Sequence, residues 1–129
     1  MAVLISIVGV AAQQDPKAAK GRVVMPAPGA TTASAFAVIE NPGAYAVYLV
    51  SATTDSARSV TFVDGAKNNS VVKEVEIDGY EALTMAPTAM HMRLEELKQP
   101  LRLGDTLTIT LTTELGVKIV VSATVVEKE

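Results

Sequence analysis

Four side chains that can coordinate a soft metal ion lie within eight consecutive residues of the sequence. They are Met85, Met90, His91 and Met92. Thioether sulfur and neutral imidazole nitrogen are soft to borderline ligands that suit Cu(I), and such a site needs no cysteine. We therefore take these four residues as candidate ligands of a Cu(I) ion.

The same residues also allow an ordinary structural interpretation. In an extended strand, Met90 and Met92 point to one face and His91 to the other, so the three share one ion only where the strand bulges or bends. Methionine packs adaptably into irregular gaps of a core. In this alternative the methionines fill the core and His91 is a lone histidine at its rim.

The rest of the composition excludes several kinds of site. The 129 residues include no cysteine and one histidine. This rules out disulfides, thiolate metal sites, a cysteine nucleophile and any site that needs two imidazoles from one chain. Few catalytic constellations remain, and we expect no enzyme. The net charge is −3, with no basic stripe for phosphate neutralisation, so we expect no nucleic-acid partner.

The N-terminus carries a short apolar segment. Residues 2–12 form an apolar run of eleven residues, whereas a membrane-spanning helix needs about 20. The length is typical of the core of a signal peptide. We expect residues 1–12 to be a signal peptide or membrane anchor, which makes the protein periplasmic or otherwise exported and limits membrane contact to this segment. The alternative is a first strand over residues 3–10.

A polar linker is expected next, over residues 13–20, where Pro16 discourages regular structure. Residues 21–127 then form one domain. Residues 106–112 alternate strictly, with Leu107, Ile109 and Leu111 on one face and threonines on the other, which predicts a half-buried strand. Further strands are expected over residues 22–25, 34–40, 45–52, 59–63, 71–77 and 118–126, with short segments at 82–85 and 90–94. Residues 94–98 could form one helical turn, and no other helix is expected.

Strand signals recur every eight to fifteen residues, separated by turn signals such as Asn41-Pro42-Gly43. Alternating strands with polar outer faces predict an all-β fold, a Greek-key β-sandwich of seven to nine strands.

Three stretches of the sequence together resemble one family. They are residues 21–32, residues 35–43, and residues 91–106 with the alternating strand that follows. In this order and spacing they are similar to the PCu(A)C-type periplasmic copper chaperones. The resemblance covers nearly the whole domain and implies a cupredoxin-like β-sandwich. It also implies Cu(I) as cargo and a copper-accepting partner, such as a subunit of cytochrome oxidase.

The family binds Cu(I) with two histidines and two methionines, in the pattern of a His, a Met some ten residues on, and a His-x-Met pair about twenty residues later. Carried over by position, the second His is His91. The Met two residues on is replaced by Arg93 and the first His by Val63, and the first Met falls near Glu74. One ligand of four is matched in place.

Two functions follow as hypotheses. The first is a copper chaperone-like protein that binds and delivers Cu(I) with an incomplete set of ligands. The second is an exported β-sandwich that has lost the copper site and acts as an interaction module through a face or an edge strand. Convergence of His91 with two methionine sulfurs would favour the first. An isolated His91, with Arg93 paired to Glu74, would favour the second.

Overall fold

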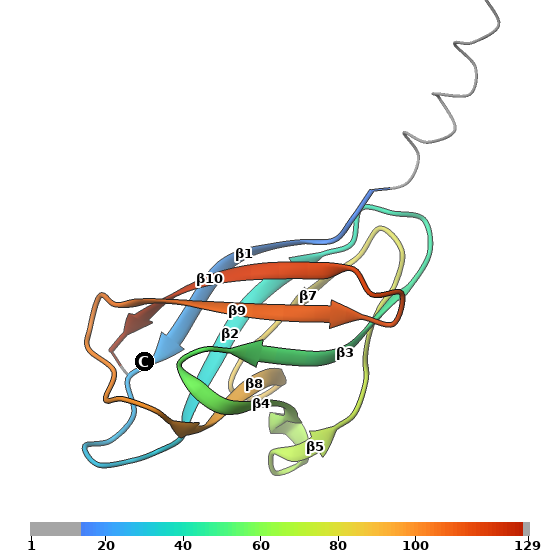
Figure 1. Ribbon diagram of the computed structural model, residues 1–129. Coiled ribbons are helices and arrows are strands. Elements are labelled where there is room, and N and C mark those ends of the chain that lie inside the picture. The colour runs from blue at the N-terminus through green and yellow to red at the C-terminus, as the bar shows by residue number, and fades with distance from the viewer. Residues whose placement is uncertain (1–13, 128–129) are drawn as a thin grey trace, which may run out of the picture.

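The backbone of the protein is built almost entirely from strands. A computed structural model describes residues 14–127 and contains one short 3₁₀ helix, η1 (Gly65–Lys67), and ten strands (Figure 1). The strands are β1 (Lys17–Val24), β2 (Ala33–Glu40), β3 (Val47–Thr54), β4 (Ala57–Asp64), β5 (Ser70–Val72), β6 (Val75–Ile77), β7 (Ala82–Thr84), β8 (Met90–Leu97), β9 (Thr106–Thr113) and β10 (Lys118–Val126).

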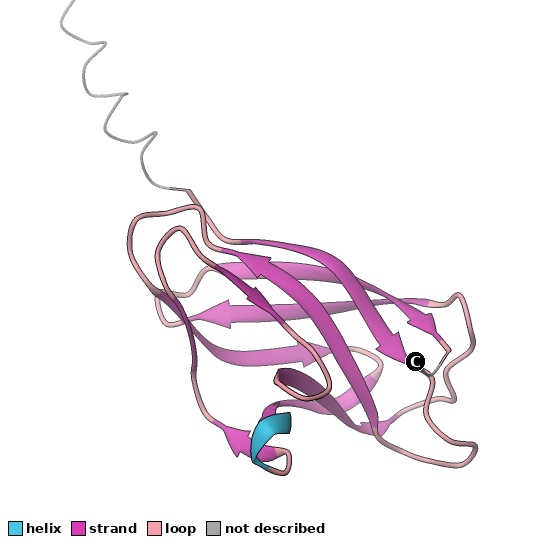
Figure 2. Ribbon diagram, turned by 180° about the vertical axis from the view of Figure 1, so that it is seen from behind, coloured by secondary structure: helices cyan, strands magenta, loops and turns pink. Residues whose placement is uncertain are grey.

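These strands form a single curved sheet in the order β5-β4-β8-β2-β1-β10-β9-β3-β6, with β7 also paired to β2. Pairing is antiparallel except between β1 and β10, which run parallel. The sheet curls over on itself and encloses the core (Figure 2). The all-β prediction is confirmed, and the number of strands exceeds the expected seven to nine because three of the ten are only three residues long.

The core is filled by small and medium apolar side chains from opposing strands. In β9, Leu107, Ile109 and Leu111 are buried while the threonines between them are partly or fully exposed, as the alternation predicts. The strand β10 repeats this pattern in antiparallel register with β9. Across the core, β8 contributes Met92 and Leu94, both with no exposed surface. The inner faces of β8 and β9 are therefore fixed by packing.

The segment expected to be one strand over residues 71–77 is two strands on opposite sides of an opening in the sheet. β5 pairs with β4, and β6 pairs with β3. Lys73 and Glu74 carry the chain across, so Val71 is exposed while Val75 and Ile77 are buried. The prediction of one strand over residues 71–77, which would place Val71, Val75 and Ile77 on one face, was wrong, because alternation in sequence does not show where a strand changes its partner.

Two further expectations are corrected. Residues 17–20, expected in the linker, belong to β1, where Ala18 and Ala19 pair with Ile39 and Val38 of β2. The helical turn expected over residues 94–98 is wrong, because residues 94–97 complete β8 and gain ladder hydrogen bonds there. The expected signal peptide or anchor over residues 1–12 lies outside the described residues. No helix within residues 14–127 is long and apolar enough to cross a membrane.

Candidate metal centre

The candidate site lies where β8 runs beside β4. The two strands are antiparallel, and the register places Val63 directly opposite His91. Directly opposed residues have Cβ atoms roughly 5 Å apart on the same face. The position that aligns with the family's first histidine therefore does lie beside the second one, but it holds a valine with no exposed surface.

His91 itself is held by the loop that precedes β8. Its Nδ1 atom lies 2.9 Å from the carbonyl oxygen of Ala89, which also accepts a hydrogen bond of 2.9 Å from the amide of Gly65. A carbonyl can only accept, so Nδ1 carries the proton. In the neutral ring the lone pair then lies on Nε2. A backbone carbonyl that fixes the tautomer in this way is common behind metal-bound histidines.

Only 4% of the surface of His91 is exposed. Nε2 has no hydrogen-bond partner, and within residues 14–127 no buried side-chain nitrogen or oxygen lacks one. Nε2 must therefore reach the surface. Its free lone pair is the one feature of a Cu(I) ligand that this position retains.

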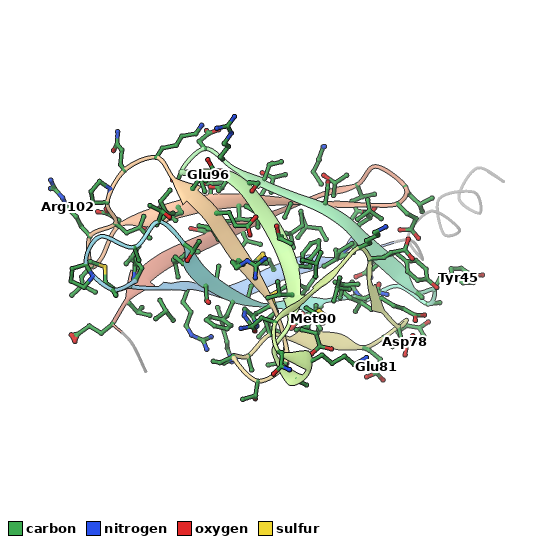
Figure 3. All side chains as sticks on the ribbon, turned by 90° about the horizontal axis from the view of Figure 1, so that it is seen from below. Tyr45, Asp78, Glu81, Met90, Glu96 and Arg102 are labelled. Carbon is green, nitrogen blue, oxygen red and sulfur yellow. The ribbon has the colours of Figure 1, made fainter. Side chains whose placement is uncertain are left out.

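The methionines do not join His91. Met92 and Met85 are buried in the core, with exposed fractions of 0% and 2%, and Met90 is partly buried and packs against the core. Met90 lies at the start of β8 (Figure 3) and, with Met92, alternates with His91 along the strand. Their side chains therefore leave the strand on the face opposite to His91. The core-filling interpretation of these three residues agrees with this packing.

A stack of rings and a cation occupies the face where His91 lies. The His91 ring is 5.2 Å from the ring of Phe36, and the guanidinium carbon of Arg22 lies 4.7 Å above that same ring. Arg22 and Phe36 are directly opposed in the β1–β2 ladder. A cation over an aromatic face is favourable, but a second cation bound beside it would be repelled.

Arg93, at the position of the family's last methionine, is engaged in an ion pair. Its Nε atom donates to Glu95 at 2.9 Å, and both side chains are about one third exposed. Glu74 lies elsewhere: Glu76, with smaller contributions from Glu114 and Glu74, raises the pKa of Tyr48 in β3. The pair of Arg93 with Glu74, which would have favoured the metal-free hypothesis, does not form, because Glu74 sits between β5 and β6.

The available donors therefore do not form a complete Cu(I) site. One imidazole nitrogen is free, the neighbouring positions hold a valine and an arginine, and the thioethers lie in or against the core. Within the described part of the chain, no three histidine, aspartate or glutamate side chains gather to hold a metal ion. A lone neutral ligand gives weak binding, since Cu(I) prefers several soft donors.

The pKa of Glu95 offers a test of the polar face beside His91. The Thr61 hydroxyl, which donates to Glu95 at 3.1 Å, and the neighbouring Arg93 hold the pKa of this carboxyl below its usual value. We expect Thr61→Val to raise that pKa, as read from the carboxyl carbon in an NMR titration. Because the folded pKa is depressed, the stabilisation exists above the unfolded pKa and is lost as the pH falls through the folded one.

The matched control for this titration is Thr112→Val, which removes a hydroxyl bonded to Lys118 and remote from Glu95. The control should leave the pKa of Glu95 unchanged. Identical titration curves for Glu95 in Thr61→Val and the parent chain would show that the hydroxyl does not hold the carboxylate.

Comparison with known proteins places the chain in one family. The sequence model of the LpqE-like family, described as "Putative lipoprotein LpqE-like", matches residues 7–125. The chain belongs to the LpqE-like family. A comparison with curated proteins finds no match.

Solved structures similar to this LpqE-like chain are PCuAC domains. The apo PCuAC domain of PmoF1 has a TM-score of 0.78 at 26% identity, over 86% of this chain and 92% of that one. The copper-bound PCuAC domain of PmoF2 has a TM-score of 0.76 at 21% identity, over the same shares of the two chains. Cu(I)-bound DR1885 from Deinococcus radiodurans gives 0.69 at 28% identity, over 85% of this chain and 75% of that one. The resemblance to the PCu(A)C-type family and its cupredoxin-like sandwich is confirmed.

Sequence reasoning missed the surroundings of His91. Arg22 and Phe36 come from β1 and β2, more than fifty residues away in sequence. Their alignment with each other and with His91 depends on the register of three strands. The one available signal was the large aromatic at Phe36 within a strand of small residues, and it does not identify its partners.

Proposed function

We propose that this chain is an exported, copper-carrier-like domain that contacts Cu(I) through Nε2 of His91 alone and therefore holds its cargo weakly. The observation that supports this proposal is the orientation of the imidazole. Nδ1 is bound to a backbone carbonyl and Nε2 is free and reaches solvent. The similarity to copper-binding PCuAC domains supports the choice of metal.

Weak binding by one ligand suits transfer between proteins. An ion held by His91 needs further soft donors, which an acceptor protein would supply, and a subunit of cytochrome oxidase is the kind of acceptor that the family suggests. No catalytic role is proposed.

The family description and the apolar run of residues 2–12 support an exported, membrane-tethered location. The 129 residues contain no cysteine, so none of them can carry a cysteine-linked lipid.

A specific observation favours a second candidate, a metal-free interaction module. The guanidinium groups of Arg22 and Arg93 both lie on the face of the sheet that carries His91, where they oppose the approach of a cation. In this case the domain acts through its surface, and the sheet offers an opening because β3 and β4 form no ladder with each other within the described residues.

An anaerobic Cu(I) titration against a chromophoric competitor separates the two candidates. We expect the parent chain to compete weakly and His91→Ala to lose measurable competition, because His91 is the only ligand in this proposal. Glu96→Ala, a change at an exposed residue paired with Arg58, is the control and should bind as the parent does. No competition by the parent chain would refute copper binding and leave the interaction module. If His91→Ala binds Cu(I) as tightly as the parent chain does, His91 is not a ligand of the ion.

A further inference from the structure

Three loops meet at the end of the sandwich where the described chain begins. They are residues 41–46 after β2, residues 78–81 after β6 and residues 114–117 between β9 and β10. The buried amide of Asn41 donates to the carbonyls of Tyr45, Ile77 and Asp78 at 2.8, 3.0 and 3.1 Å, which joins the first two loops. We call the three loops, with Gln14, the N-terminal pole.

Each loop of this pole exposes one large apolar side chain. Tyr45, Tyr80 and Leu115 have 75%, 76% and 80% of their surface exposed. Gln14, Tyr45 and Leu115 line one hollow of about 140 Å³, and the amide of Tyr80 donates to the carbonyl of Gly43 in the first loop. Large apolar side chains exposed on three adjoining loops make this pole a candidate contact surface.

The chain that leads to this pole indicates what the surface contacts. Only Gln13 separates Gln14 from the apolar run of residues 2–12, whose composition suits the apolar interior of a bilayer. A bilayer that takes up this run would therefore lie close to the N-terminal pole. Tyrosine, with an apolar ring and a polar hydroxyl, is enriched at the level of lipid headgroups.

We propose that the N-terminal pole rests on the surface of a lipid bilayer, with Tyr45, Tyr80 and Leu115 at headgroup depth. The inference rests on the membrane-tethered location proposed above and is independent of copper binding. Acidic side chains outnumber basic ones around the pole, and this favours neutral, zwitterionic headgroups over anionic ones. The acidic residues are Asp15, Asp78, Glu81 and Glu114, and the basic ones are Lys17 and Lys118.

The orientation can be read with an introduced fluorophore, because the chain contains no tryptophan. The full chain carrying Leu115→Trp is mixed with phosphatidylcholine vesicles whose acyl chains are brominated. We expect its emission to shift to shorter wavelength and to be quenched. The control is Leu103→Trp, which is 54% exposed and lies next to Arg102, at the end of the sandwich opposite to Tyr45 (Figure 3). The control should stay unquenched on the same vesicles.

A second measurement tests the contribution of the three side chains to binding. In the full chain, Tyr45→Ser, Tyr80→Ser and Leu115→Ser combined should weaken vesicle binding by about tenfold or more, since affinity scales with buried apolar area. Leu103→Ser should not change it. Failure of the full chain to bind vesicles would overturn the proposal. Vesicle binding without quenching at position 115 would also overturn it. A triple variant with altered self-association and unchanged vesicle binding would overturn it as well, and would indicate that a second copy of the chain covers this surface.

Discussion

Replacing Val63 by His and Arg93 by Met in the same chain should turn a weak Cu(I) ligand into a tight site. We expect the affinity for Cu(I) to rise by at least about a hundredfold. Loss of a residue that merely supports a metal ligand lowers the metal affinity about 10–100-fold. Two direct ligands should change the affinity by more than that. The measurement is the anaerobic competition titration of the double variant beside the parent chain.

The geometry explains why these two positions suffice. Val63 is opposite His91 in the β4–β8 ladder, so the two imidazoles would share one face at cross-strand distance. Residue 93 is two residues along β8 from His91 and points to that face as well. The change at Arg93 also removes a permanent cation from the face of His91.

The single variants Val63→His and Arg93→Met are the controls for this gain and should each give a smaller increase. Val63 is fully buried, so thermal unfolding with and without Cu(I) must accompany the titration. A site that binds the folded state raises the unfolding temperature in the presence of the ion. A double variant that is folded and binds Cu(I) no more tightly than the parent would contradict the inference that these two residues block the site.

Asn41→Ala should lower the free energy of unfolding by about 3 kcal/mol, since each buried polar group left without a partner costs about 1–3 kcal/mol. The Asn41 side chain is 2% exposed and donates to three backbone carbonyls, and its Oδ1 accepts from the amide of Gly43 at 3.2 Å. Chemical denaturation measures the loss.

The matched control is Ser59→Ala, which removes an exposed hydroxyl bonded to Glu95 and should change the free energy of unfolding by less than about 0.5 kcal/mol. If Asn41→Ala unfolds at the same denaturant concentration as Ser59→Ala, water replaces Asn41 as the donor to the three backbone carbonyls. Asn41 then does not hold the N-terminal pole together.

Elements whose pattern is local could be predicted from the sequence. The alternation in β9 and β10 is complete within each strand, so the inward face of β9 and the extent of β10 match the structure, and β9 runs one residue beyond the predicted range of 106–112. The break at Lys73 and Glu74 depends on which strands pair with β5 and β6. Such pairing is set by contacts distant in sequence, and the pattern of one segment does not contain it.

The candidate site, too, could be predicted from the sequence only in part. Its family position, His91, and the replacements at residues 63 and 93 are visible in the sequence alone. The orientation of the imidazole cannot be predicted from the sequence, because it depends on the carbonyl of Ala89 and on the ring of Phe36 from another strand. Backbone acceptors and cross-strand rings have no signature at the level of residue type.

The most direct test of a Cu(I) contact through His91 alone is the ¹⁵N spectrum of the imidazole during an anaerobic Cu(I) titration. The chain has one histidine, so its two ring nitrogens are assigned without ambiguity. We expect a protonated Nδ1 and a bare Nε2 in the free protein, then a gradual shift of Nε2 that does not saturate at one equivalent, with the methyl signals of Met85, Met90 and Met92 unmoved. An unchanged Nε2, or saturation at one equivalent with shifted methionine methyls, would contradict this account of the site.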